Sequence, residues 1–193
     1  MTGVAEIMDR LPYRYPMLLI DRVTSVVPRE RLTACKAVTI SEPWFGGGSR
    51  PGPGPAVAAA PPVFPAAPPV FPTVLLIESL CQAAGLLAAW EAPKPSVLSG
   101  DVMLLGSLSS VTVQGSVEPG SIICHEVRLV RSFDGGHIFA GTSAVDGRPV
   151  LRIGQMIMAI RPAGTVTHAA AAASANGGPV TSGGPVPGAG GQR

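Results

Sequence analysis

Apolar positions cover almost the whole circumference of a helix that the pattern predicts between Val74 and Trp90. A helix that is apolar nearly all round is buried inside a protein. The segment carries a single carboxylate, Glu78, and Gln82 lies one turn later on the same face. Thr73 comes just before the helix and is its predicted N-cap. We therefore expect any activity of this protein to centre on Glu78.

Alternation of apolar and polar residues predicts strands on both sides of this helix. A short helix at Val4–Arg10 and two neighbouring strands, Met17–Val27 and Leu32–Ile40, come first, and Lys36 is predicted to point outward from the second strand. Turn signals such as Asp146-Gly147 separate the later strands by short connections, which implies an antiparallel sheet. The later strands are 97–105, 108–117, 121–131, 137–145 and 150–160. One buried helix beside such a sheet indicates an α+β fold in which the sheet curls around the helix.

Two stretches are too rich in proline, glycine and alanine to pack into a core, one at about residues 46–68 and the other at 162–193. Near the end of the first, the hexapeptide Ala60–Pro65 is repeated as Ala67–Pro72. Such composition gives an extended or flexible loop, and we leave open whether it is a neutral expansion. We predict one domain over residues 1–161, with this insertion, followed by a disordered tail at 162–193.

Charge and cysteine content narrow the class of protein. The net charge is only +2 and no basic stripe with interleaved aromatic residues occurs, so nucleic-acid binding is not expected. No apolar run reaches the length that crosses a membrane, and the N-terminus does not resemble a signal peptide. The cysteines, which show no metal-binding spacing, are Cys35, Cys81 and Cys124. They are predicted to be reduced core thiols in a cytoplasmic protein.

Three segments resemble motifs of one known family. Leu11–Val23 (LPYRYPMLLIDRV) resembles its opening strand motif, and Val38–Phe45 (VTISEPWF) resembles the run that leads into its catalytic loop. Pro69–Gly85 (PVFPTVLLIESLCQAAG) resembles its central helix. The family is the β-hydroxyacyl-acyl-carrier-protein dehydratases, which have the hotdog fold, a long central helix wrapped by a curved antiparallel sheet. The similarity spans about residues 5–160, with a gap at the proline-rich block.

The resemblance implies a specific reaction. Enzymes of this family remove water from a (3R)-hydroxyacyl thioester on acyl carrier protein in fatty-acid or polyketide synthesis, and the product is a trans-2-enoyl thioester. They are dimers or trimers of dimers with active sites at the dimer interface, and they use no metal or organic cofactor. A histidine in a Gly-His-Phe-Pro-Gly loop is the base, because its pKa lies near neutrality. A carboxylate on the other subunit's central helix assists departure of the hydroxyl group.

The resemblance carries over to individual positions with two departures, of which the missing histidine is the more serious. Glu78 falls on the carboxylate position, Gln82 falls on the family's glutamine, and Thr73 replaces a glycine at the helix entrance, where its N–H could stabilise the thioester oxygen. The resemblance therefore implies that Glu78 is catalytic and that Gln82 and Thr73 bind the substrate. The histidine position falls on Gly48 or Ser49, and neither residue can act as a base near pH 7.

The other histidines do not fall at the base position either. His125 lies in the middle of a predicted strand, where we expect a partly exposed sheet residue. His137 follows a turn and is expected at a loop edge, whereas His168 belongs to the predicted tail. Tyr13, where relatives often have histidine, is predicted to be structural.

Three hypotheses follow from the missing histidine. In the first, the chain is a dehydratase-like subunit that lends Glu78 to a histidine-bearing paralogue in a heterodimer. In the second, it is an active dehydratase by itself, as a homodimer, with an atypical base or water-mediated chemistry, although loss of a general base typically costs about 10²–10⁴-fold in rate. In the third, it is a non-catalytic module that binds or scaffolds acyl thioesters, which the fold alone does not exclude.

Overall fold

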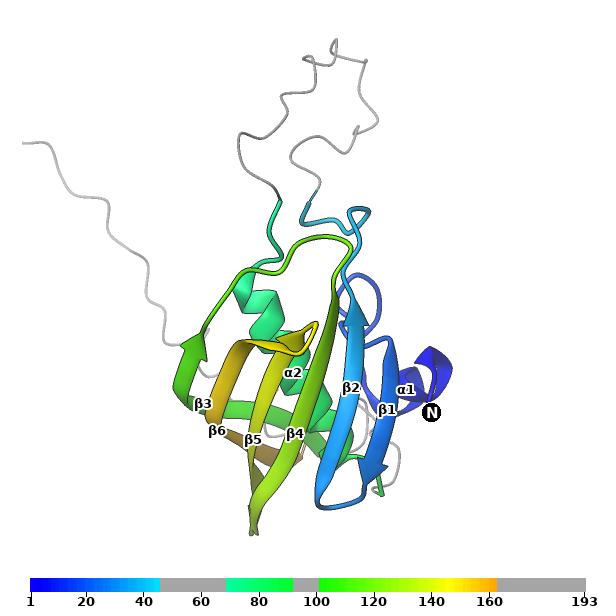
Figure 1. Ribbon diagram of the computed structural model, residues 1–193. Helices are drawn as coiled ribbons and strands as arrows, with labels where there is room; N and C mark the ends of the chain where they lie inside the picture. The colour runs from blue at the N-terminus through cyan, green and yellow to red at the C-terminus, as the bar shows by residue number, and fades with distance from the viewer. Residues whose placement is uncertain (46–68, 92–100, 163–193) are drawn as a thin grey trace, which may run out of the picture.

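A six-stranded antiparallel sheet curls around one long helix in the computed structural model of the protein, which describes residues 1–45, 69–91 and 101–162 (Figure 1). The strand order is β1-β2-β4-β5-β6-β3, and every neighbouring pair is antiparallel. The elements are α1 (Val4–Arg10), β1 (Arg22–Val27), β2 (Arg31–Ala37), α2 (Thr73–Ala88), β3 (Asp101–Val113), β4 (Ile122–Phe133), β5 (Gly136–Val145) and β6 (Arg148–Pro162). The predicted α+β layering is confirmed.

Helix α2 is buried along most of its length, as its apolar pattern predicts. Ten of its residues, including every one from Ser79 to Leu87, are buried. The predicted N-cap is wrong by one position, because Pro72 is the N-cap and Thr73 is the exposed first residue of the helix. The fixed φ of proline, −57° here, suits the start of a helix, and the Pro72 carbonyl accepts hydrogen bonds from Leu75 N and Leu76 N.

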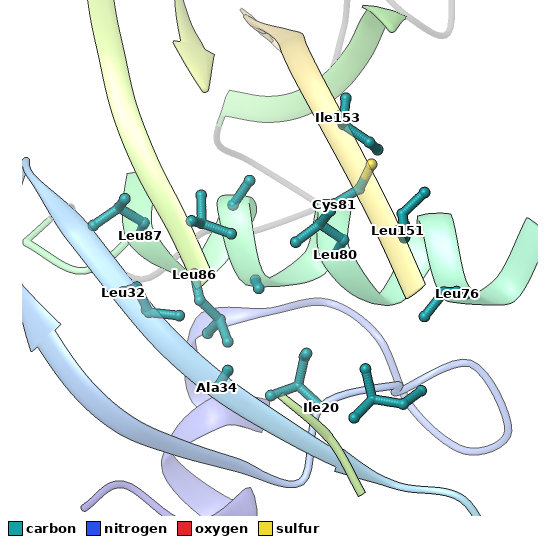
Figure 2. Close-up of a cluster of buried hydrophobic side chains, with 14 of the residues drawn as sticks. Ile20, Leu32, Ala34, Leu76, Leu80, Cys81, Leu86, Leu87, Leu151 and Ile153 are labelled. Carbon is teal, nitrogen blue, oxygen red and sulfur yellow. The ribbon is translucent and has the colours of Figure 1, made fainter. Parts of the chain in front are cut away.

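The core lies between α2 and the concave face of the sheet. Figure 2 shows Leu80 and Leu86 of the helix among side chains from the strands and from the segment before β1. The fully buried partners include Ile20, Leu32, Ile123, Leu151 and Ile153. Close approach of α2 to the sheet requires Gly141 in β5, because a Cβ there would lie 3.0 Å from Leu80 Cδ1 and 3.0 Å from the Glu126 carbonyl oxygen. The sheet therefore fits the helix as a close-packed shell.

Strand β2 shows the opposite orientation from the one predicted for Lys36. The Lys36 side chain is buried, 6% exposed, on the same face as Leu32 and Ala34. Burial of a lysine is tolerated where its ammonium group is paired. Here Nζ donates to Glu42 Oε1 at 2.9 Å and to the Ala37 carbonyl at 2.6 Å, contacts that the alternation pattern alone could not reveal.

Two strand boundaries also differ from expectation. The first strand begins at Arg22 instead of Met17, because side chains of α2 bind the backbone of the preceding segment in place of a neighbouring strand. The two strands predicted at 97–105 and 108–117 are one strand, β3, interrupted only by a register shift between Leu105 and Ser107. The glycine between them marks a bulge in the strand instead of a turn.

Several predictions concern parts of the chain outside the described residues. The insertion at about 46–68 and the tail after Pro162 are among them, so the predicted division into a domain over 1–161 and a tail stays a prediction. Within the described ranges, no helix is long and apolar enough to cross a membrane.

Candidate active site

Glu78 lies half-buried in the second turn of α2, between two hydrogen-bond donors. Gln82 Nε2 donates to Glu78 Oε1 at 3.0 Å, and the Tyr13 side chain makes a hydrogen bond to the same carboxyl group. Burial, followed by the charge and hydrogen bond of Glu78, raises the pKa of Tyr13 to about 12. The phenol therefore stays protonated near pH 7 and donates to Glu78.

Gln82 joins the candidate site to the chain segment that precedes β1. Its side chain is 1% exposed, and Oε1 accepts a hydrogen bond from Leu19 N at 2.8 Å. Its two amide hydrogens go to the Met17 carbonyl, at 2.8 Å, and to Glu78. All three contacts are with the protein itself, so Gln82 fixes both the carboxylate and the segment carrying Tyr13.

A second buried polar group lies on the other side of Leu19. Ser79 Oγ donates to the Leu19 carbonyl at 2.7 Å and lies 2.7 Å from His125 Nε2, while His125 Nδ1 lies 2.8 Å from Ser143 Oγ. Because the only hydrogen of the Ser79 hydroxyl goes to Leu19, His125 donates from Nε2 and accepts at Nδ1 from Ser143. We call Ser79, His125 and Ser143 the core polar triad.

The core polar triad corrects the expectation that His125 is partly exposed. His125 is 1% exposed, and burial lowers its pKa to about 3, so the ring is neutral near pH 7. Strand β4 alternates with Ile123, His125 and Val127 inward, a pattern that could have identified the buried histidine. Because both ring nitrogens are bonded to serines and the residue is almost completely buried, His125 has no free lone pair for a substrate proton.

His137 lies far from Glu78. It sits in β5, where Nδ1 pairs with Ser132 Oγ at 3.1 Å, and burial and the charge of Arg29 lower its pKa. His137 lines a pocket of about 220 Å³, and Leu87 of α2 lines the same pocket. At 1.5 Å per residue, Leu87 lies about 14 Å from Glu78 along the helix axis. Neither histidine in the described part of the chain is therefore a base for chemistry at Glu78.

The segment that leads toward the expected base loop ends close to the start of α2. The Trp44 and Phe71 rings meet edge to face with centroids 5.7 Å apart, and Phe45 lies 6.4 Å from the same ring. Phe71 precedes Thr73 by two residues, so the chain leaves for residues 46–68 beside the N-terminus of the helix. Gly48 and Ser49 lie outside the described residues. Among those that are described, no three side chains of His, Cys, Asp or Glu gather into a group that could hold a metal ion.

Comparison with known proteins decides the family. The FabA-like domain family matches residues 64–154. A 3-hydroxyacyl-[acyl-carrier-protein] dehydratase FabZ from Halorhodospira halophila is 38% identical over 146 residues, which cover 76% of this chain and 84% of the relative. This chain belongs to the FabZ dehydratase family. A FabZ from Shewanella oneidensis is also 38% identical, over 151 residues, and 85% of that relative is covered.

Solved structures confirm the hotdog fold that the FabZ family membership implies. The dehydratase heterocomplex ApeI:P from Xenorhabdus doucetiae matches with a TM-score of 0.63 at 17% identity, covering 85% of this chain and 96% of that one. The fluoroacetyl-CoA thioesterase FlK matches with a TM-score of 0.54 at 15% identity, covering 77% and 97%. Dehydratases and thioesterases thus share this architecture, and the chemistry of the FabZ-family chain described here must be argued from its own side chains.

Proposed function

We propose that this chain is a dehydratase subunit that acts on (3R)-hydroxyacyl thioesters of acyl carrier protein in the cytoplasm, and that it contributes Glu78 to an active site completed by a histidine-bearing partner. The observation that carries the proposal is the Glu78 carboxyl group, which Tyr13 and Gln82 hold in place on a buried helix. A carboxylate placed in this way by two donors, in a chain of the FabZ family, is a fixed reactive group.

Dehydration needs two groups on the substrate. A base removes the proton from C2, and the bond between C3 and the hydroxyl group breaks as the C2–C3 double bond forms. A carboxyl group can hydrogen-bond or protonate the departing oxygen, which leaves as water. Glu78 takes this second role in the proposal, and the backbone N–H of Thr73 at the helix start is assigned to the thioester oxygen.

The base must then come from elsewhere. His125 is enclosed by two serines, and His137 lies at the opposite end of α2 from Glu78. A paralogue with an intact Gly-His-Phe-Pro-Gly loop would supply the missing histidine across a dimer interface. Strand β3 is an edge of the sheet and exposes Leu105, Val111 and Val113, which supports pairing of this edge with a second subunit.

An activity assay with a 3-hydroxyacyl-acyl-carrier-protein tests the proposal. We expect no more than background turnover by this protein alone and robust turnover when it is mixed with a histidine-bearing FabZ-family paralogue whose own central-helix carboxylate has been changed to glutamine. Glu78→Gln should abolish the turnover of that mixture. Glu118→Gln removes an exposed carboxylate and serves as the matched control.

Two other results would contradict the proposal. Robust turnover by this protein alone would show that it carries its own base. Absence of turnover in the mixture, together with tight binding of a non-hydrolysable acyl thioester, would instead support an acyl-binding or scaffold protein. His125 is enclosed, and His137 lies at the far end of α2 from Glu78, which favours that second candidate over an enzyme that acts alone.

A further inference from the structure

Cys35 and Cys124 face each other on neighbouring strands, on the convex side of the sheet. They are direct partners in the β2–β4 register, and their sulfur atoms lie 4.0 Å apart without a disulfide bond between them. Cys124 is exposed and Cys35 is half-buried, which corrects the expectation that all the cysteines are core thiols. Only Cys81, on α2, belongs to the core, at 6% exposure.

Residue pairs in an antiparallel ladder alternate between a longer and a shorter Cα–Cα distance, and the backbone register gives Cys35 and Cys124 the shorter one. The Cys35 carbonyl accepts a hydrogen bond from Asp21 N at 2.9 Å, so the backbone of Cys35 points toward the β1 side and away from β4. Val38 N, three residues further on, instead donates to the Ser121 carbonyl on the β4 side. Cys35 and Cys124 are therefore a non-hydrogen-bonded pair, for which Cα atoms lie about 4.5 Å apart. Disulfides span Cα separations of roughly 4.4–6.8 Å.

We propose that Cys35 and Cys124 form a dithiol site that low-molecular-weight disulfides oxidise reversibly to a cross-strand disulfide. The geometry requires side-chain rotation only, because the two backbones already lie at a distance that a disulfide can bridge. Cys81 is excluded from this chemistry by its burial, which, with the charge of Glu78, raises its pKa to about 12.

The reaction proceeds in two exchange steps. The exposed Cys124 loses its proton to solvent, and its thiolate attacks one sulfur of the small disulfide, releasing one small thiolate and leaving a mixed disulfide on Cys124. The Cys35 thiolate then attacks Cys124 Sγ, and the second small thiolate leaves. The protein loses two hydrogens in total, and the small disulfide is reduced to two thiols. Burial and the neighbouring Cys124 raise the pKa of Cys35, which suits Cys35 to the second, intramolecular step.

The bond would fix one part of the sheet to another. Strands β1 and β2 form a hairpin whose ladder contact with the rest of the sheet is the pairing of β2 with β4. A covalent link between Cys35 and Cys124 spans that junction. Oxidation would thus hold the hairpin, and the segment before it that carries Tyr13, against the remainder of the fold.

Oxidised glutathione, applied to the full-length protein at pH 8, tests the site. We expect wild type to lose two hydrogens in mass and two of its three alkylatable thiols, with a linked Cys35–Cys124 peptide that dithiothreitol cleaves. Cys35→Ser should instead retain a glutathione adduct on Cys124. Cys81→Ser is the matched control and should form the same linked peptide, with loss of both of its remaining thiols.

Two results would overturn the proposal. One is a stable glutathione adduct on Cys124 in wild type at the level seen in Cys35→Ser, which would show that Cys35 does not reach Cys124. The other is a disulfide between two chains through Cys124, which would show that the pair does not close within one chain.

Discussion

Ser79→Ala is expected to destabilise this protein more than the loss of one hydroxyl group usually does. Ser79 is fully buried, and its hydroxyl satisfies two other buried groups, the Leu19 carbonyl and His125 Nε2–H. Each buried polar group left without a partner costs about 1–3 kcal/mol. For the two groups together we therefore expect a loss of about 2–6 kcal/mol in the free energy of unfolding. For a domain of this size, that corresponds to roughly 4–24 °C in Tm.

Urea denaturation followed by circular dichroism measures this loss. Ser132→Ala is the matched control, because it also removes a serine that pairs with a histidine, His137, but at an exposed position. A surface change of that kind should cost less than about 0.5 kcal/mol.

A combined variant separates unpaired polar groups from lost packing. Replacing the whole core polar triad, as Ser79→Ala, His125→Leu and Ser143→Ala together, removes the orphaned imidazole and should recover at least half of the stability lost by Ser79→Ala alone. The reasoning is refuted if Ser79→Ala matches Ser132→Ala. It is equally refuted if the three changes cost as much as the sum of the three single losses.

Two further predictions follow from the same side chains. Burial holds the native pKa of His125 at about 3, against 6.5 when exposed, so the unfolded state binds more protons between these values. The contribution of neutral His125 to the free energy of unfolding should be fully present above about pH 6.5 and fall by up to about 1.4 kcal/mol per pH unit below it. Urea denaturation at several pH values should therefore give a steeper pH dependence for wild type than for the triad variant, which lacks His125. Equal pH dependence in the two proteins would contradict the low pKa of His125. Tyr13→Phe removes a hydrogen-bond donor to Glu78. This change should lower kcat in the mixed dehydratase assay roughly 5-fold, about 1 kcal/mol, with little change in KM. An equal loss of kcat in the exposed control Tyr15→Phe would argue against a positioning role for Tyr13.

The periodicity of the sequence was sufficient for the fold and insufficient for the orientation of some side chains. The nearly all-apolar stretch before Trp90 could only be a buried helix, and short turns between alternating segments required an antiparallel sheet. Lys36 and His125 are the instructive failures. Both lie inward because residues outside their own strands, Glu42 for Lys36 and two serines for His125, satisfy their polar atoms. A rule that assigns polar residues to the outside has no access to those partners.

The candidate site was predictable to a similar extent. The position of Glu78 on a buried helix follows from the sequence pattern, and its correspondence to a dehydratase carboxylate follows from the family motifs. The contact between Glu78 and Tyr13 does not follow from either. It depends on how the segment before β1, which carries Tyr13, lies against α2, and the hydrogen bonds of the Leu19 backbone to Gln82 and Ser79 fix that arrangement. The alternation pattern predicts that the strand begins at Met17, but in the structure these side-chain contacts replace strand pairing before Arg22. Only the folded structure shows this replacement.

The position of β3 at the edge of the sheet has a consequence for synthesis on the ribosome. Among the strands that the structure describes, its sole ladder partner is β6, the last of them, with Val113 opposite Leu151 and Asp101 opposite Pro162. At translation rates of about 5–20 residues per second, β3 emerges several seconds before the strand that it pairs with. During that interval both of its edges are open to other chains. A nascent or truncated chain that stops before β6 would therefore expose an unpaired β3 and an uncovered face of α2. Pairing of β6 with β3 is the step that protects the molecule from aggregation.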